Sequence, residues 1–218
     1  MKRRLPKEPS IVGMILTAVS GVSLGILLGS FILLREVPLS GIEPAESGKI
    51  GDYAAYYSPG SAAAAESATV KSRTSRLGRQ IPGSIPFTEM EINHYWSQFK
   101  SADTNEDGTP SNISFSSPNV RIETDRFVLS GKIIVNPQKD RFEVLMQAFG
   151  RFENGDSGVK MKIDKILLNS LRIPKFGGLV ENLFESNKAM FPLPTEVKSS
   201  LGAIREIELL EDQIVLAL

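Results

Sequence analysis

The stretch 11-IVGMILTAVSGVSLGILLGSFILL-34 runs for 24 residues without a charged side chain. At a rise of about 1.5 Å per residue, a helix of this length spans roughly 36 Å, which is enough to cross a ~30 Å hydrocarbon core with some tilt. Only Arg35 and Glu36 carry charge directly after the stretch, whereas four cations precede it: Lys2, Arg3, Arg4 and Lys7. Because positive charge favours the cytoplasmic side, we expect a single-pass anchor of the inner membrane, with the rest of the chain in the periplasm.

Two other interpretations of this apolar stretch fit the sequence less well. A cleaved signal peptide has an apolar region of about 7–15 residues that ends in small residues. The present stretch is longer, and the sequence Pro-Leu-Ser-Gly at residues 38–41 is a poor cleavage context. A buried helix of a soluble core fits neither the length nor the flanking charges. The sequence therefore favours an uncleaved membrane anchor.

Small residues recur at every fourth position of the predicted anchor, at Gly13, Thr17, Gly21, Gly25 and Gly29. Such a stripe lets a second membrane helix approach closely, so it indicates a homodimer or a membrane-protein partner. The alternative is that glycine is simply common in membrane helices.

Composition divides the chain into four parts: a basic cytoplasmic N-terminus (1–10), the anchor (11–34), a flexible linker (35–85) and an extracytoplasmic domain (86–218). Residues 1–85 hold 10 Lys/Arg against 6 Asp/Glu, and residues 86–218 hold 15 against 19, a net charge of −4. An acidic domain lacks the basic face that nucleic acids require. The chain has no cysteine, which excludes disulfides, thiol catalysis and cysteine-ligated zinc.

The expected linker is rich in Gly, Ser, Ala and Pro and shows no lasting periodicity, which is typical of a flexible tether. Its distal part is basic, with cations at Lys71, Arg73, Arg76 and Arg79. These cations suit either attraction to anionic lipid or envelope polymer or an ordinary solvated linker.

The folded domain is predicted to begin with a helix near residue 88. Thr88 and Glu91 fit a capping box, and Phe87 and Ile92 fit the hydrophobic staple around it. An apolar face follows at helical spacing: Ile92, Tyr95, Trp96 and Phe99. His94, the only histidine, lies off this face and has no nucleophile at readable spacing.

A possible calcium loop follows this helix. Asp103, Asn105 and Asp107, with a glycine at the sixth position, match the start of an EF-hand loop. The match ends there, because the eighth position is Pro110 and the twelfth, where a glutamate belongs, is Ser114. Asp/Asn/Gly clusters are also ordinary turn sequences, so these residues are weak calcium candidates and no metal site is expected.

Alternation with period two then predicts four long strands in residues 120–124, 127–135, 142–153 and 159–164. A second helix is expected after residue 177, and a closing hairpin near the C-terminus is expected to join the edge of the sheet. The predicted fold class is α+β, with a curved antiparallel sheet and two helices packed on one of its faces.

The order of these elements resembles YpmS-like and LmeA-like bacterial proteins. The resemblance rests on Phe-Thr-Glu-x-Glu-Ile-Asn-x-Tyr at 87–95, Leu-Arg-Ile-Pro at 171–174 and Phe-Pro-Leu-Pro at 191–194. It implies a membrane-anchored lipid-binding domain of tubular or half-barrel type, with a cavity between sheet and helices. The large flexible residues that suit such a cavity are Met146, Met161, Phe184, Met190 and Phe191.

These apolar residues are equally what a closed core needs, so three functions stay open. The first is non-enzymatic binding of lipid or another apolar ligand, without a cofactor. The second is a structural or assembly role in an envelope complex. The third, an enzyme, is disfavoured, since the chain shows no nucleophile elbow, no H-x-x-x-H and no phosphate loop.

Overall fold

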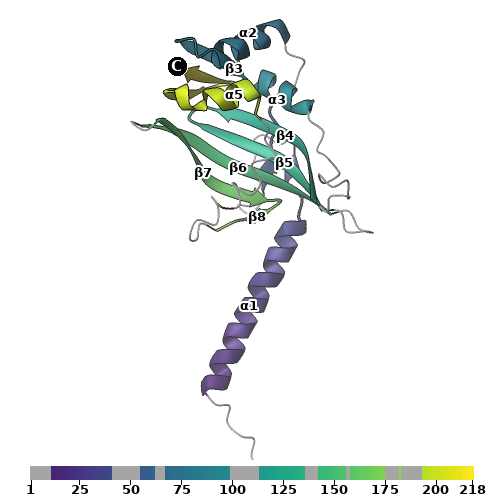
Figure 1. Ribbon diagram of the computed structural model, residues 1–218. Coiled ribbons are helices and arrows are strands. Elements are labelled where there is room, and N and C mark those ends of the chain that lie inside the picture. Colours follow the sequence, from purple (N-terminus) through teal and green to yellow (C-terminus); the bar gives the residue numbers. More distant parts are fainter. Residues whose placement is uncertain are drawn as a thin grey trace, which may run out of the picture.

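A computed structural model describes residues 11–40, 55–61, 67–98, 113–135, 142–155, 158–174, 182 and 193–218. The chain combines an N-terminal apolar helix, α1 (Ile11–Arg35), with antiparallel sheets and shorter helices. This confirms the predicted α+β class with an N-terminal apolar helix and antiparallel sheets. In Figure 1, α1 projects away from a body in which all the other elements gather.

The largest sheet is an antiparallel meander in the order β4-β5-β6-β7-β8. Its strands are β4 (Ile113–Glu123), β5 (Arg126–Val135), β6 (Phe142–Gly155), β7 (Gly158–Leu168) and β8 (Leu171–Arg172). Strand β5 alternates as expected, because Phe127 and Leu129 enter the main core while Ser130 lies on the opposite face. Asp125 makes the turn before β5 with φ of 66°, a conformation that aspartate tolerates.

A second sheet has three antiparallel strands in the order β3 (Ser84–Thr88), β10 (Gln213–Ala217), β9 (Glu206–Leu210). The C-terminal hairpin therefore does not join the edge of the large sheet, contrary to the expectation. Its partner β3 escaped prediction because it is short and contains Pro86, which an edge strand tolerates. Leu209 of β9 belongs to the main core cluster, so this small sheet packs on the large one.

Helix α3 (Glu89–Ser97) begins as the sequence predicts. Thr88 Oγ1 accepts a hydrogen bond from Glu91 N at 3.2 Å, and Glu91 Oε2 accepts one from Thr88 N at 2.9 Å. The helix lies against β4, and Trp96 is buried with Val120 in the main core. The expected continuation of its apolar face at residue 99 and the loop of Asp103, Asn105 and Asp107 lie outside the described residues.

Residues 35–85, expected to be a flexible linker, contain β1 (Leu39–Ser40), β2 (Tyr56–Tyr57) and α2 (Ser67–Gly78) as well as the start of β3. Leu77 of α2 is fully buried in a second core cluster with Ile85 and Ile204. The composition hides this because, among its described side chains, a buried leucine and an ion pair of Arg73 with Glu91 at 2.7 Å hold the helix, rather than a long apolar stripe. The folded body therefore begins well before residue 86.

Two short helical segments complete the body, α5 (Thr195–Ser200) and the 3₁₀ turn η3 (Leu201–Ala203). The buried hydroxyl of Ser200 donates to Leu77 O at 2.8 Å, which joins α5 to α2. The helix expected after residue 177 falls outside the described residues, apart from Asn182.

Candidate functional site

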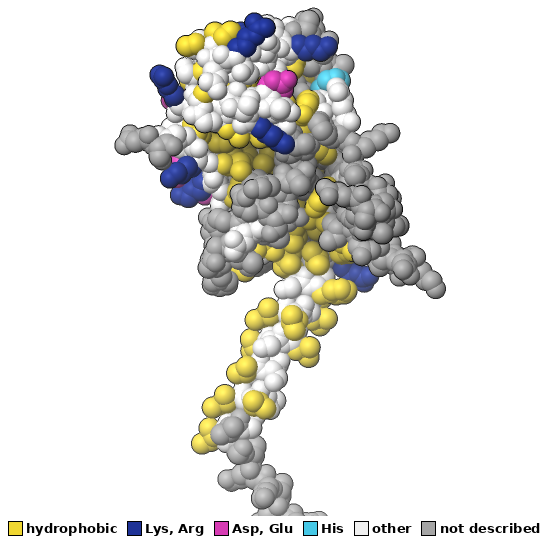
Figure 2. Space-filling model, viewed as in Figure 1, with side chains coloured by type: hydrophobic (Ala, Val, Ile, Leu, Met, Phe, Trp, Pro, Cys, Tyr) yellow, Lys and Arg dark blue, Asp and Glu magenta, His cyan; other side chains and the backbone are white. Residues whose placement is uncertain are grey.

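Helix α1 exposes most of its apolar side chains, from Ile11 to Ile32 (Figure 2). Within the described residues it is the one helix long and apolar enough to cross a membrane, over Gly13–Arg35. None of that span is buried against the rest of the chain. Length and composition therefore support membrane insertion of α1.

The C-terminus of α1 is held by the turn between β7 and β8. Asn169 Nδ2 donates to Leu34 O at 2.6 Å, and Ser170 N donates to Leu33 O at 3.2 Å. The hydroxyl of Ser170 also donates to Glu36 O at 2.9 Å. The last carbonyls of a helix lack partners within it, so a distant part of the chain here supplies the donors.

Asn169 is itself fixed to the sheet. Its Oδ1 accepts from Leu145 N, and its own N–H donates to Leu145 O, both at 2.8 Å. It is 2% exposed and has φ of 50°, a left-handed conformation that asparagine adopts more readily than most residues. The body is therefore joined to the end of α1 through hydrogen bonds as well as through the connecting chain.

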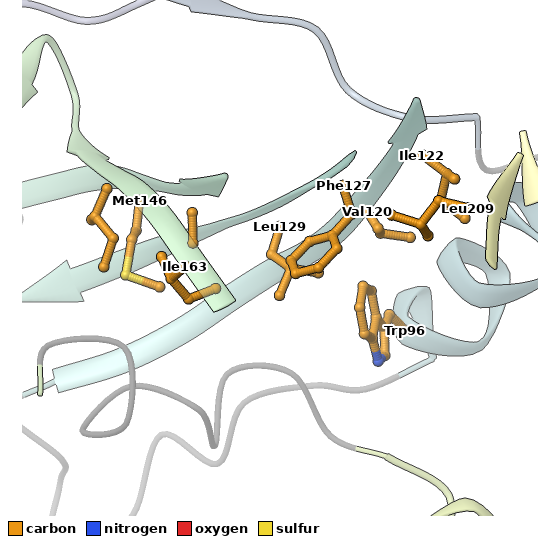
Figure 3. Packing of buried hydrophobic residues seen from close by; sticks show 10 residues of the cluster. Trp96, Val120, Ile122, Phe127, Leu129, Met146, Ile163 and Leu209 are labelled. Atoms are coloured by element: carbon orange, nitrogen blue, oxygen red, sulfur yellow. The ribbon is translucent and has the colours of Figure 1, made fainter. Parts of the chain in front are cut away.

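One face of the large sheet is apolar from this junction to α3. Met146, fully buried, pairs with Leu168, the residue directly before Asn169. The apolar side chains continue through Leu129 and Phe127 to Trp96, as Figure 3 shows. We call this the core face, and the opposite side of the sheet the outer face.

The five residues proposed to line a cavity do not form one cluster among the described residues. Met146 lies on the core face, fully buried. Met161 is 44% exposed and lies on β7 seven residues before Leu168, toward the other end of the strand. Phe184, Met190 and Phe191 lie outside the described residues.

The small residues of α1 leave an open surface. A Cβ built at Gly21, Gly25 or Gly29 would meet nothing within 4 Å. Thr17 turns inward, because its hydroxyl donates to Gly13 O at 2.8 Å. This geometry leaves room for a second helix, and association stays a prediction.

A short segment, Gly60–Ser61, is fastened to the free edge of β4. Glu89 Oε1 accepts from Ser61 N at 2.6 Å, and its Oε2 accepts from Ile122 N at 2.7 Å. Asn93 Nδ2 donates to both Ser61 O (2.9 Å) and the carbonyl of residue 120 (2.7 Å). Side chains of α3 thus satisfy backbone groups of Val120 and Ile122, which protects this part of the edge from pairing with another chain. No local sequence pattern predicts this arrangement.

A cleft of about 340 Å³ lies beside this segment, lined by Pro59, Glu89, Arg121, Ile122, Glu123, Thr124, Glu211 and Asp212. Its carboxylates are engaged in part, because Glu123 pairs with Arg121 at 3.4 Å and also contacts Arg126. Across the described ranges, no group of three His, Asp or Glu side chains is placed to hold a metal ion. The single histidine, His94, has its Nε2 3.2 Å from Gln98 Nε2 within the same helix.

Comparison with known proteins gives no family for this chain: no family model matches it, and no curated protein is detectably similar.

Proposed function

We propose that this protein is a non-enzymatic, membrane-anchored module that binds the acyl chain of a lipid, or a similar apolar ligand, on the core face of its large sheet. The observation that carries the proposal is the junction of Asn169 with Leu34. Because Leu168 and Met146 adjoin this turn, the core face starts where α1 ends. An acyl chain leaving the bilayer beside α1 meets an apolar surface at once, and burying each CH₂ group is favourable by about 0.8 kcal/mol.

In this proposal the sheet curves around the ligand, the second helix that the sequence predicts after residue 177 covers it, and the body lies in the periplasm above the inner membrane. This is the architecture implied by the resemblance to YpmS-like and LmeA-like proteins. Half-buried side chains along the membrane-proximal core face, among them Phe115, Ile133 and Ile173, supply the adaptable surface.

Photocrosslinking tests the proposal. The full chain is reconstituted in phosphatidylcholine liposomes that contain a trace of phospholipid with a diazirine in its acyl chain. After illumination, proteolysis and mass spectrometry identify the labelled peptides. We expect label on α1, which serves as the internal control, and also on the peptides of β6 and β8. Label confined to α1 would overturn the proposal.

A pair of variants tests whether the labelling of the sheet depends on the core face. Leu168→Glu places a charge on the core face next to the junction, whereas Met161→Glu places one at an exposed position on the same strand. Leu168→Glu should reduce the labelling of β6 and β8 several-fold and leave the labelling of α1 unchanged. Met161→Glu should change neither, and equal losses in both variants would show that the effect is not local.

The alternative is an assembly role in an envelope complex, favoured by the open surface at Gly21, Gly25 and Gly29. For this role, Gly21→Leu with Gly25→Leu should abolish crosslinks between α1 and a partner helix in the membrane. The same double variant leaves the lipid labelling of the sheet intact if the first proposal holds.

A further inference from the structure

The outer face of the large sheet carries an unusual group of cations. Lys165 Nζ lies 3.8 Å from the centroid of the Phe149 ring, so its charge sits on an aromatic face rather than beside a carboxylate. Burial lowers the pKa of Lys165, and the charges of Arg172 and Arg126 lower it further. The fold therefore keeps like charges close together at a partly desolvated position.

Arg172 lies next to Lys165 on this face. In the register of β7 with β8, Arg172 is directly opposite Leu167, and Lys165 is two residues before Leu167 on the same side of the strand. Within the described part of the chain, neither Lys165 nor Arg172 has a carboxylate partner.

Most other described cations of the same sheet have a carboxylate partner; Lys160, at the exposed end of β7, has none among the described residues. Each of the following lies within 4.0 Å of a carboxylate: Arg121 and Arg126 with Glu123, Lys132 with Glu143, Arg151 with Asp164, and Lys162 with Glu153. Among the residues that the structure describes, Lys165 and Arg172 therefore form a positively charged pair without a carboxylate counter-ion. An external anion would relieve the repulsion between them.

The position of the pair indicates where that anion comes from. Arg172 is two residues after Ser170, whose hydroxyl and N–H both donate to Glu36 O just beyond the end of α1. If α1 crosses the bilayer, Arg172 lies at the level where α1 leaves it, which is the level of the lipid headgroups. Arginine matches phosphate oxygens with a fork of two N–H donors, and lysine adds a compact charge.

We propose that Lys165 and Arg172 bind the phosphate of an anionic phospholipid in the membrane that holds α1. The site lies on the outer face of the sheet and does not depend on ligand binding at the core face. Its role is to fix the body against the headgroups, with the core face directed along the bilayer surface.

Native mass spectrometry of the full chain tests this site. The protein is released from nanodiscs that contain equal amounts of phosphatidylglycerol and phosphatidylcholine, and the retained lipids are counted. The variant Lys165→Gln with Arg172→Gln is compared with Lys160→Gln with Arg205→Gln, which removes the same charge from exposed positions. All variants keep the cations at the N-terminus of the chain.

The wild-type chain and the control should retain phosphatidylglycerol over phosphatidylcholine, and the Lys165/Arg172 variant should lose this preference several-fold. Equal retention of phosphatidylglycerol in all three proteins would overturn the proposal. Leu168→Glu, which addresses the core face, should leave the preference unchanged, so failure of one proposal is distinguishable from failure of the other.

A soluble anion is the competing source of phosphate. Inorganic phosphate is titrated against the full chain in nanodiscs of phosphatidylcholine alone, with thermal unfolding as the readout. We expect phosphatidylglycerol nanodiscs to stabilise the wild type more than millimolar phosphate does, and the Lys165/Arg172 variant to lose that gain. If phosphate stabilises the wild type as well as phosphatidylglycerol does, the lipid assignment is wrong.

Discussion

Asn169 and Leu34 are 135 residues apart in the sequence, and a hydrogen bond of 2.6 Å joins the amide Nδ2 of the first to the carbonyl oxygen of the second. Asn169 is at the same time bonded to Leu145 in β6 through both its backbone and its side chain. One buried residue thus connects the end of α1 to the middle of the sheet. The orientation of the body relative to α1 follows from this contact.

Replacing Asn169 by glycine tests this connection, because glycine accepts the positive φ but provides no side chain. Leu34 O and Leu145 N each lose a partner, and unsatisfied buried groups cost about 1–3 kcal/mol. We expect lower stability of the body and a broader distribution of distances between a spin label on α1 and one on β7, measured by double electron–electron resonance in nanodiscs. Ser170→Ala keeps the backbone donor to Leu33 O and should leave the distribution narrow. An unchanged distribution in Asn169→Gly would show that the turn does not orient the body.

Gly60 is a position where a side chain has no room. A Cβ at Gly60 would lie 2.0 Å from Val120 O and 2.7 Å from Glu89 Oε1. Gly60→Ala should therefore displace the Gly60–Ser61 segment and lower the free energy of unfolding by several kcal/mol, a loss that is exceptional for a single substitution. Gly202→Ala, which meets nothing within 4 Å, should change it by less than about 0.5 kcal/mol. Chemical denaturation of the two variants makes the comparison, and equal stabilities would contradict the packing at Gly60.

Glu89 binds two backbone N–H groups with its two oxygens, one from Ser61 and one from Ile122. In Glu89→Gln, the NH₂ group faces one of these donors, so we expect a loss of about 1–3 kcal/mol. Hydrogen exchange should then show faster exchange at the amides of Ser61 and Ile122. Glu206→Gln, at an exposed position of β9, is the control. Unchanged exchange at Ile122 would show that Glu89 does not hold the edge of β4.

The parts of the fold that the sequence predicted are those specified by neighbouring residues. The side chains of β5 point alternately to either face, which is how Phe127, Leu129 and Ser130 were assigned correctly. The capping box at Thr88 is equally local, because its partner Glu91 is three residues away. Local patterns of this kind can be read without knowing what the segment packs against.

The parts that escaped prediction depend on contacts between distant residues. Leu77 is a buried residue of α2 only because Ile204 and Ile85 pack against it. The need for a glycine at position 60 follows from the nearby side chain of Glu89, which is 29 positions later in the sequence. In the sequence, the segment around Asn169 resembles an ordinary turn. Its role at the junction is visible only in the structure, where the end of α1 lies next to it. Composition alone therefore predicted a flexible tether for a segment whose helix α2 packs in the folded body.

The pKa of Lys165 gives a prediction with a definite sign. Burial, reinforced by the charges of Arg172 and Arg126, lowers this pKa from its ordinary value of 10.5. Below the lowered folded-state pKa, the folded and unfolded chains both carry the proton, and the folded state bears the full cost of the buried charge. As the pH rises through the lowered folded-state pKa toward 10.5, the folded chain releases the proton first, so the free energy of unfolding increases over that window.

Lys165→Met removes the charge and keeps a long side chain over Phe149. The variant should be more stable than the wild type at pH 7, and its advantage should shrink as the pH approaches 10.5. Thermal unfolding of the full chain in phosphatidylcholine nanodiscs across this pH range measures the difference, with Lys160→Met at the exposed end of the same strand as the control. In phosphatidylglycerol nanodiscs the headgroup phosphate stabilises the ammonium group, so the advantage at pH 7 should fall or reverse. An advantage that is the same in both lipids would mean that Lys165 meets no anion at the membrane surface.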